Sequence, residues 1–252
     1  TDISNSPEAY RYYINGYHAH FKGDYPAAIS NLNQALKIDS NLIMAAWMIS
    51  WAYGLMGNYD EAKKWCLTIY GKRDQMPVKQ KILTNLLYDK FFDKSKYNEI
   101  KCIKQLLEID DQNNGSIWML GRAYGELYQY KNAIPLLEKA LEICSKWELK
   151  PPFVAFYVDL GIAYHKTGMY KKEKELYKKA EQDFPDDTLL ISRQAILSLT
   201  EGDAIAANRY IKKYKSLSKE NSTSEADITS GLASIYCEAA ILDKAEVNYS
   251  EA

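Results

Sequence analysis

Apolar and small residues recur along the chain at three- and four-residue intervals, in segments separated by short polar turns. This spacing places them on one face of an α-helix, so it predicts amphipathic helices rather than strands. Glycine, proline and polar residues gather in stretches such as 71–78, 145–152 and 216–225, which is typical of loops between helices. The pattern predicts an all-α protein.

The helical segments repeat. Three of the clearest units read GYHAHFKGDYPAAISNLNQAL (16–36), LGRAYGELYQYKNAIPLLEKAL (120–141) and LGIAYHKTGMYKKEKELYKKA (160–180). In each, a turn separates two helical patterns, and one residue before x-Tyr marks that turn. The equivalent turn residues along the chain are Gly23, Gly57, Ser95, Tyr128, Gly168, Gly202 and Ala240. Because these stand 33 to 40 residues apart, the chain is predicted to contain about seven helix pairs.

Small residues mark where the two helices of each pair should cross, since close backbones leave no room for large side chains. The first-helix positions are Gly16, Ser50, Tyr88, Gly121, Gly161, Ala195 and Ala233. Their second-helix counterparts are Ala28, Ala62, Ile100, Ala133, Glu173, Ala207 and Ala245. The third repeat has Tyr88 and Ile100 at these positions, so its two helices are predicted to stand further apart.

These units resemble the tetratricopeptide repeat, whose signature combines Leu-Gly, Tyr, a Gly-x-Tyr turn, Ala and an aromatic residue. The resemblance implies a right-handed α-α superhelix over residues 1–252, a single solenoid. The expected repeats are 9–42, 43–77, 78–113, 114–150, 151–187, 188–224 and a truncated 225–252. Pro135, about four residues into a second helix, is expected to bend that helix.

Composition and motifs argue against catalysis and against several partner classes. The 32 basic and 33 acidic residues balance, so nothing indicates nucleic-acid binding. The uncharged run 40–58 falls inside a repeat and is interrupted by Gly54 and Gly57, so no membrane insertion is expected. There is no GxxxxGK[ST], HExxH, GxSxG or CxxC motif, and the three histidines have no metal-ligand spacing. We therefore expect no catalytic residue, no metal site and no cofactor.

A second stripe on the first helices carries the functional prediction. Positions 4, 7, 8 and 11 of each repeat face the partner helix, and positions 2, 5, 9 and 12 lie about 130° round, at roughly 100° per residue. The resemblance implies that this second stripe lines a concave peptide-binding groove. In the N-terminal half it is aromatic, and its candidate peptide-binding residues are Tyr10, Tyr13, Tyr17, Trp47, Trp51, Trp118 and Arg122. Two interpretations stay open, buried rings between successive helices or accessible rings in a channel.

An accessible aromatic stripe fits a hydrophobic or aromatic peptide segment, or an amphipathic helix. Chaperone-binding members of the family capture a C-terminal carboxylate with Lys and Asn on this stripe. Tyr13 and Tyr17 stand there instead, so no such carboxylate clamp is expected. Arg122 and Arg193 remain candidates for contacting an acidic group.

Other functions stay open at this stage. The opening SPEAYRYYINGYHAHFKGDYPAAI resembles repeat arrays joined to bacterial signalling proteins, which implies a regulatory segment that closes on its own neighbouring domain. An enzyme would need converging groups, for instance Asp89, Arg122, Asp159 and His165. The last helix stops at Ala252 without a polar cap, which favours weak self-association. The cytoplasm is the favoured location, with the periplasm open if a signal peptide preceded Thr1.

Overall fold

A computed structural model describes residues 6–241, 244 and 246–248. Within them, every regular element is a helix, which confirms the all-α helical-repeat prediction. The chain divides into two compact units, residues up to Ala123 (unit 1) and from Tyr124 onward (unit 2). Ala245 and Ala252, on which the predictions for the last repeat depend, lie outside the described residues. The expected repeat boundaries stay a prediction.

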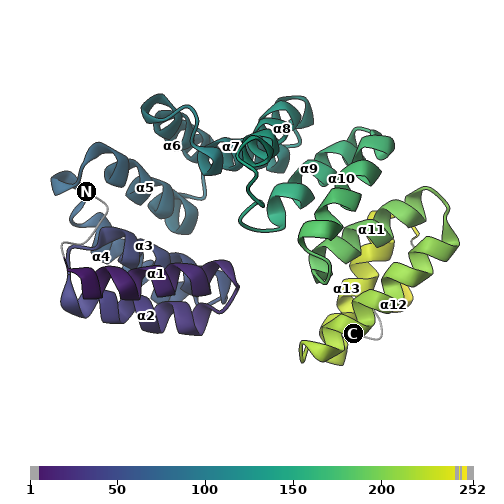
Figure 1. Ribbon diagram of the computed structural model, residues 1–252, viewed down its shortest axis with the longest axis horizontal. Coiled ribbons are helices and arrows are strands. Elements are labelled where there is room, and N and C mark those ends of the chain that lie inside the picture. Colours follow the sequence, from purple (N-terminus) through teal and green to yellow (C-terminus); the bar gives the residue numbers. More distant parts are fainter. Residues whose placement is uncertain (1–5, 242–243, 245, 249–252) are drawn as a thin grey trace. The chain divides into compact units, whose positions relative to one another are not determined.

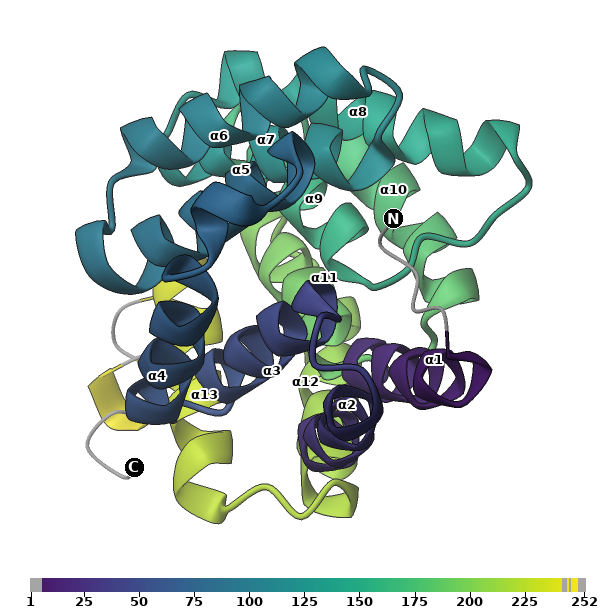
Figure 2. The same cartoon turned by 90° about the vertical axis from the view of Figure 1, so that its left-hand side faces the viewer.

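Unit 1 is built from helix pairs joined by tight turns. Its elements are α1 (Pro7–Phe21), α2 (Tyr25–Ile38), α3 (Ile43–Leu55), α4 (Tyr59–Tyr70), the 3₁₀ turn η1 (Arg73–Gln75), α5 (Val78–Tyr88), the π-helix η2 (Asp89–Asp93), α6 (Lys96–Ile109) and the larger part of α7 (Asn114–Glu126). Helices α1 and α2 lie side by side, as do α3 and α4, and α2 also packs on α3 (Figures 1 and 2). From α1 to α6, each helix therefore packs on its sequence neighbours.

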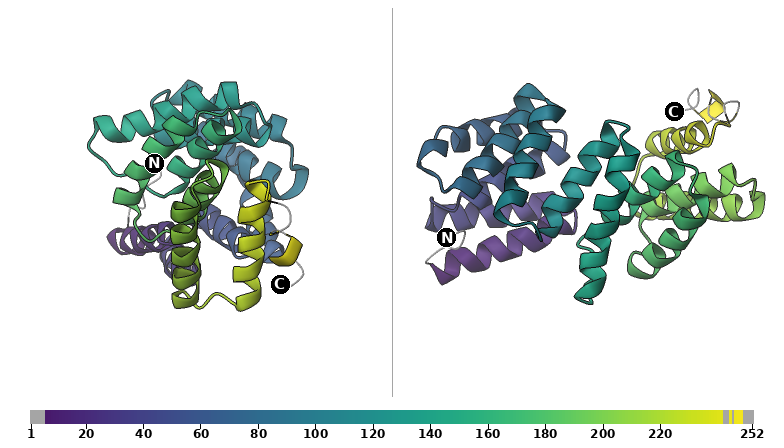
Figure 3. Two further views of the ribbon diagram at one scale, coloured as in Figure 1. Left: turned by 90° about the vertical axis from the view of Figure 1, so that its right-hand side faces the viewer. Right: turned by 90° about the horizontal axis from the view of Figure 1, so that it is seen from above.

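Unit 2 repeats the same plan. It contains α8 (Tyr130–Lys146), α9 (Ala155–Lys166), α10 (Tyr170–Asp183), α11 (Thr188–Thr200), α12 (Ala204–Glu220) and α13 (Glu225–Glu238). Helix α11 packs on α12, and α13, the yellow helix of Figure 3, packs on both. Ile196 and Ile211 meet Ile228, Leu232 and Ile235 in the core that holds α13.

The turns inside the helix pairs explain the repeating glycine. The residue after the first helix adopts a left-handed conformation, for example φ 81° at Gly23, and the next N–H closes the helix end. Thus Asp24 N donates to Ala19 O over 3.0 Å, which is the Schellman arrangement. The left-handed residues at the remaining turns are Gly57, Lys94, Tyr128, Gly168, Gly202 and Ala240. Six of the seven predicted turn residues are therefore confirmed; in the third repeat Lys94 takes the place predicted for Ser95.

Small residues lie where paired helices meet, as predicted in the first two repeats. A Cβ added to Gly16 would stand 2.6 Å from Leu32 Cγ and 3.1 Å from Ala28 O. In the next pair, the Ser50 hydroxyl donates a 2.7 Å hydrogen bond to Ala62 O. This bond satisfies the only polar group of a fully buried side chain. The crossings fix how each pair presents its other faces.

The third repeat departs from the predicted register. The residues that meet across α5–η2 and α6 are Asp89 and Cys102, whose thiol lies 3.8 Å from the carboxylate, rather than Tyr88 and Ile100. Tyr88 instead stacks on Tyr70, with ring centroids 4.1 Å apart. The π-helix η2 begins at Asp89, and its Phe91 covers Gly54 of α3.

Candidate functional site

The predicted aromatic stripe of the first repeat is partly open. Tyr10 and Tyr17 on α1 are each 38 % exposed, and Phe21, one turn beyond Tyr17, is 36 % exposed. Tyr17 and Phe21 contact each other with ring centroids 4.5 Å apart, and Tyr10 stacks on Tyr13 at 6.4 Å. Tyr13 is half-buried against the core shared by α1, α2 and α3. The accessible rings thus follow one face of α1 for about three turns.

In the second repeat the stripe tryptophans are neither fully buried nor fully accessible. Trp47 and Trp51 of α3 are half-buried and stacked, 5.1 Å apart with a 12° interplanar angle. Trp47 Nε1 donates a 3.0 Å hydrogen bond to Leu83 O of α5, which fixes the pair against the next repeat. The Lys90 ammonium lies 4.2 Å from the Trp51 ring centroid, a cation–π contact. Gly54, the last stripe position, is covered by Phe91 of the π-helix.

In the fourth repeat the Trp118 ring is buried, whereas the Arg122 cation beside it is exposed. Trp118 is 8 % exposed, and the exposed Arg122 guanidinium lies 5.6 Å from its ring centroid. Arg122 is therefore the member of this pair that a ligand meets first. Peptide contact by either residue stays a prediction.

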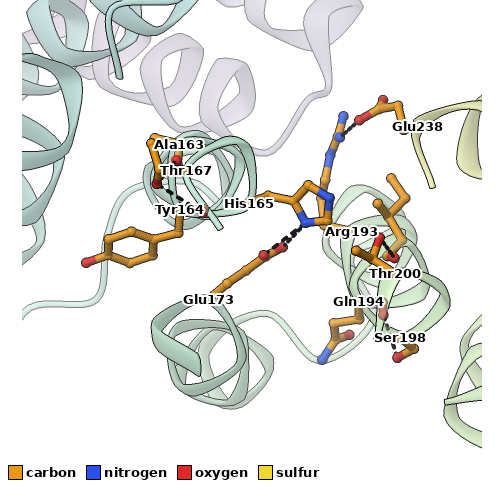
Figure 4. A network of polar contacts seen from close by, with 11 residues as sticks. Ala163, Tyr164, His165, Thr167, Glu173, Arg193, Gln194, Ser198, Thr200 and Glu238 are labelled. Carbon is orange, nitrogen blue, oxygen red and sulfur yellow. Dashed lines mark hydrogen bonds and ion pairs between the residues drawn. The ribbon is translucent and has the colours of Figure 1, made fainter. Parts of the chain in front are cut away.

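Unit 2 carries a polar cluster where the sequence stripe loses its aromatic residues (Figure 4). His165 Nδ1 of α9 lies 3.0 and 3.2 Å from the two carboxylate oxygens of Glu173 on α10. Glu173 is 1 % exposed, and both of its carboxylate oxygens face this ring nitrogen. Glu173 stands at the crossing position that alanine fills in most repeats. Its burial thus depends on a specific partner.

The cluster extends to α11 and α13. An Arg193 Nη1 donates to a carboxylate oxygen of Glu238, the last residue of α13 (Figure 4). The Tyr177 ring fills the space above Gly161, where an added Cβ would stand 2.2 Å from the Tyr177 hydroxyl. Burial raises the pKa of Tyr177 well above its ordinary value, and Glu173 adds to the rise, so the hydroxyl stays protonated.

In the sequence, Glu173 stood out as a large residue at a position expected to be small, and Arg193 was a candidate for contacting an acidic group. His165, Arg193 and Glu238 belong to three different repeats, so only the fold brings them together. Asp89 and His165, two of the groups named for an enzyme, have different partners. Asp89 faces Cys102 in unit 1, where burial and the neighbouring Asp93 raise its pKa, whereas His165 faces Glu173 in unit 2. Over the residues that the structure describes, no three His, Cys, Asp or Glu side chains form a metal-binding group.

A family comparison agrees with this architecture. The sequence model of the tetratricopeptide repeat matches residues 45–69, 115–146 and 154–182. These segments contain α3 with most of α4, α7 with α8, and α9 with most of α10. The chain carries tetratricopeptide repeats. The family prediction from the sequence is therefore confirmed for these three segments.

Solved tetratricopeptide structures share the fold at low sequence identity. The APC/C hetero-tetramer Cut9–Hcn1 has a TM-score of 0.67 and 14 % identity over 90 % of this chain, which spans only 42 % of that chain. A tetratricopeptide-repeat protein from Parabacteroides merdae ATCC 43184 has a TM-score of 0.56 and 16 % identity, covering 98 % of this chain and 92 % of that one. A Rap protein complexed with Competence and Sporulation Factor has a TM-score of 0.68 and 16 % identity, covering 99 % and 75 %.

No curated protein sequence matches this chain. Among the residues that the structure describes, no helix combines the length and the apolar character that crossing a bilayer requires.

Proposed function

We propose that this chain is a protein-interaction scaffold that holds a polypeptide segment against the aromatic side chains of unit 1. The observation that carries the proposal is the open aromatic face of α1, formed by Tyr10, Tyr17 and Phe21. Soluble helices normally turn polar residues outward, so three aromatic side chains on one exposed face call for a partner.

Residue type supports the proposal more strongly than area does. A tyrosine or phenylalanine can bury on the order of 150–250 Å², so three rings about a third exposed offer roughly 200 Å². That area alone is not unusual for a monomer. Tyrosine, tryptophan and arginine, however, dominate binding hot spots, and Trp51, Lys90 and Arg122 extend the same chemistry into the next repeats.

The comparisons support the same class of function. One structure of similar fold is a complex with Competence and Sporulation Factor, and another is a hetero-tetramer. The runner-up proposal uses the same surface: a regulatory segment of a larger bacterial signalling protein whose aromatic face packs on another domain of that protein. Both proposals predict that Tyr10 and Tyr17 are contact residues, and neither requires catalysis.

The test uses a phage-displayed library of random 12-residue peptides selected on the intact chain. Enriched peptides are then titrated by fluorescence polarisation against a Tyr10→Ser/Tyr17→Ser variant. Losing two hot-spot rings should weaken binding at least tenfold, which corresponds to about 1.4 kcal/mol. Tyr59→Ser/Tyr97→Ser is the matched control, because both of these tyrosines are well exposed at turns away from α1.

Equal binding by the Tyr10→Ser/Tyr17→Ser variant, with its helicity intact, would contradict the proposed site. If the library enriches no peptide, peptide binding itself is contradicted. If another domain of the larger protein binds to this chain when added in trans and competes with the enriched peptides, the result supports the runner-up proposal.

A further inference from the structure

The polar cluster of unit 2 surrounds a small pocket that the proposed function does not use. The pocket is lined by Ile162, His165, Lys166, Glu173, Tyr177, Arg193, Ile196 and Glu238, and it has room for about one water molecule. Ile162, His165 and Ile196 occupy positions of the second stripe on the first helices of their repeats. The pocket therefore opens on the face of unit 2 that corresponds to the aromatic face of unit 1 along the repeat.

Arg193 has unused hydrogen-bonding capacity in this pocket. Its Nη1 donates to Glu238, but its buried Nε has no acceptor within hydrogen-bond distance among the described residues. A guanidinium presents Nε–H and a terminal N–H side by side, a fork that matches the two oxygens of one carboxylate. The terminal nitrogen beside Nε is Nη2, so Glu238, which accepts from Nη1, does not use this fork.

The charges of the pocket already accommodate a carboxylate. Glu173 is held by His165 Nδ1, while Arg193 and Lys166 add two cations and the Tyr177 hydroxyl adds a donor. Replacing the Glu238 carboxylate by that of a ligand leaves this balance unchanged. Burying an additional charge would be costly, but exchanging one carboxylate for another is not.

We propose that Arg193 is a binding site for the carboxylate of an acidic residue in a partner polypeptide, and that Glu238 is its internal competitor. Glu238 is suited to leave because it is the last residue of α13 and its side chain is 33 % exposed. Ile162 and Ile196 line the same pocket and offer an apolar contact for the residue next to the acidic one. The site lies in unit 2 and is independent of the aromatic face in unit 1.

The test follows the Arg193 Nε–H signal by NMR on the intact chain, with the signal assigned from an Arg193→Lys variant. The probe is the capped dipeptide N-acetyl-Glu-Ile-amide, and N-acetyl-Gln-Ile-amide is its neutral counterpart. N-acetyl-Gln-Ile with a free C-terminus distinguishes a terminal carboxylate from a side-chain carboxylate. We expect a saturable shift with N-acetyl-Glu-Ile-amide and none with the neutral probe, whereas a shift with the free-C-terminus probe alone would overturn binding of an acidic side chain.

The competitor role of Glu238 gives a second readout. A tethered group competes at an effective concentration in the millimolar range, so Glu238→Gln should tighten binding of the acidic probe several-fold to about tenfold. The matched control is Glu201→Gln, which removes the 2.7 Å ion pair with Lys174 elsewhere in unit 2. It should leave the affinity unchanged.

Three further results would overturn the proposal. One is the absence of a saturable shift even in Glu238→Gln, and the second is an equal shift with the neutral probe, which would indicate only a buried-water site. The third is a gain in affinity from Glu201→Gln as large as that from Glu238→Gln. Circular dichroism of each variant separates these outcomes from unfolding.

Discussion

The crossing of α9 and α10 gives the sharpest prediction for stability. A Cβ at Gly161 would stand 2.2 Å from the Tyr177 hydroxyl oxygen and 2.4 Å from Cε1. Such distances are far inside van der Waals contact, and Tyr177 is 2 % exposed with only a water-sized pocket beside it, so its ring has little space to move into. Gly161→Ala must therefore expel the ring or push the two helices apart.

The two responses differ in cost. Expelling a ring that buries on the order of 150–250 Å² loses about 4–6 kcal/mol at about 25 cal/mol per Å². Shifting the helices falls in the overpacking range of about 1–3 kcal/mol, so the helices shift. Alanine returns about 1 kcal/mol over glycine as a helix former. The net loss should be about 0–2 kcal/mol, or a fall in Tm of up to roughly 8 °C, against a gain of about 1 kcal/mol where the added Cβ meets nothing.

Urea and thermal unfolding followed by circular dichroism measure this loss. Gly125→Ala is the matched control, since no atom lies within 4 Å of the added Cβ and the helix should gain stability. In a Tyr177→Ala background, which removes the ring, Gly161→Ala should become neutral or stabilising. The packing argument fails if Gly161→Ala matches Gly125→Ala, or if its penalty persists without the ring.

Three further predictions concern single positions. Tyr128 and Ala240 adopt a left-handed backbone conformation at φ 60°, which costs energy for any residue but glycine. Replacing either by glycine should raise the unfolding free energy measured in urea titrations by about 0.5–1 kcal/mol. A lower unfolding free energy for both variants would contradict this backbone strain. Pro135 lies inside α8 and cannot donate to the helix, so Pro135→Ala should raise Tm, with an unchanged Tm as the opposing result. Burial lowers the pKa of His20, so below pH 6.5 the unfolded chain binds a proton that the folded chain does not, and the unfolding free energy should fall as pH falls. The His20→Gln variant should show a flatter dependence of unfolding free energy on pH between about pH 7 and 5. An unchanged dependence would assign it to other groups.

Local chemistry accounts for what the sequence predicted well. Glycine before x-Tyr predicted the turns because only a left-handed residue completes the helix end, as the φ values of 71° to 81° at the four turn glycines show. Gly16 and Ser50 predicted two crossings because a close approach excludes large side chains. These signals are contained within one helix pair and need no knowledge of the rest of the chain.

The failures have a common cause in longer-range packing. Whether a stripe tryptophan is buried depends on the neighbouring repeat. For example, the backbone carbonyl of Leu83 on α5 accepts a hydrogen bond from Trp47. The cluster around Glu173 joins side chains from three repeats, and no regular residue spacing in the sequence predicts it. The third-repeat register was wrong because Tyr88, predicted at the crossing, packs on Tyr70 of the preceding repeat, and Asp89 lies at the crossing instead.

The π-helix Asp89–Asp93 also changes how the length of a repeat is interpreted. The spacing from Gly57 to the turn residue Lys94 is 37 residues, and comparison with a period of about 34 would place all the surplus in loops such as 71–77. A π-helical turn absorbs an additional residue inside the helix without lengthening any loop. In such arrays an insertion can therefore be stored within a helix, where it changes which side chains face the neighbouring helix while leaving both ends of the repeat in place.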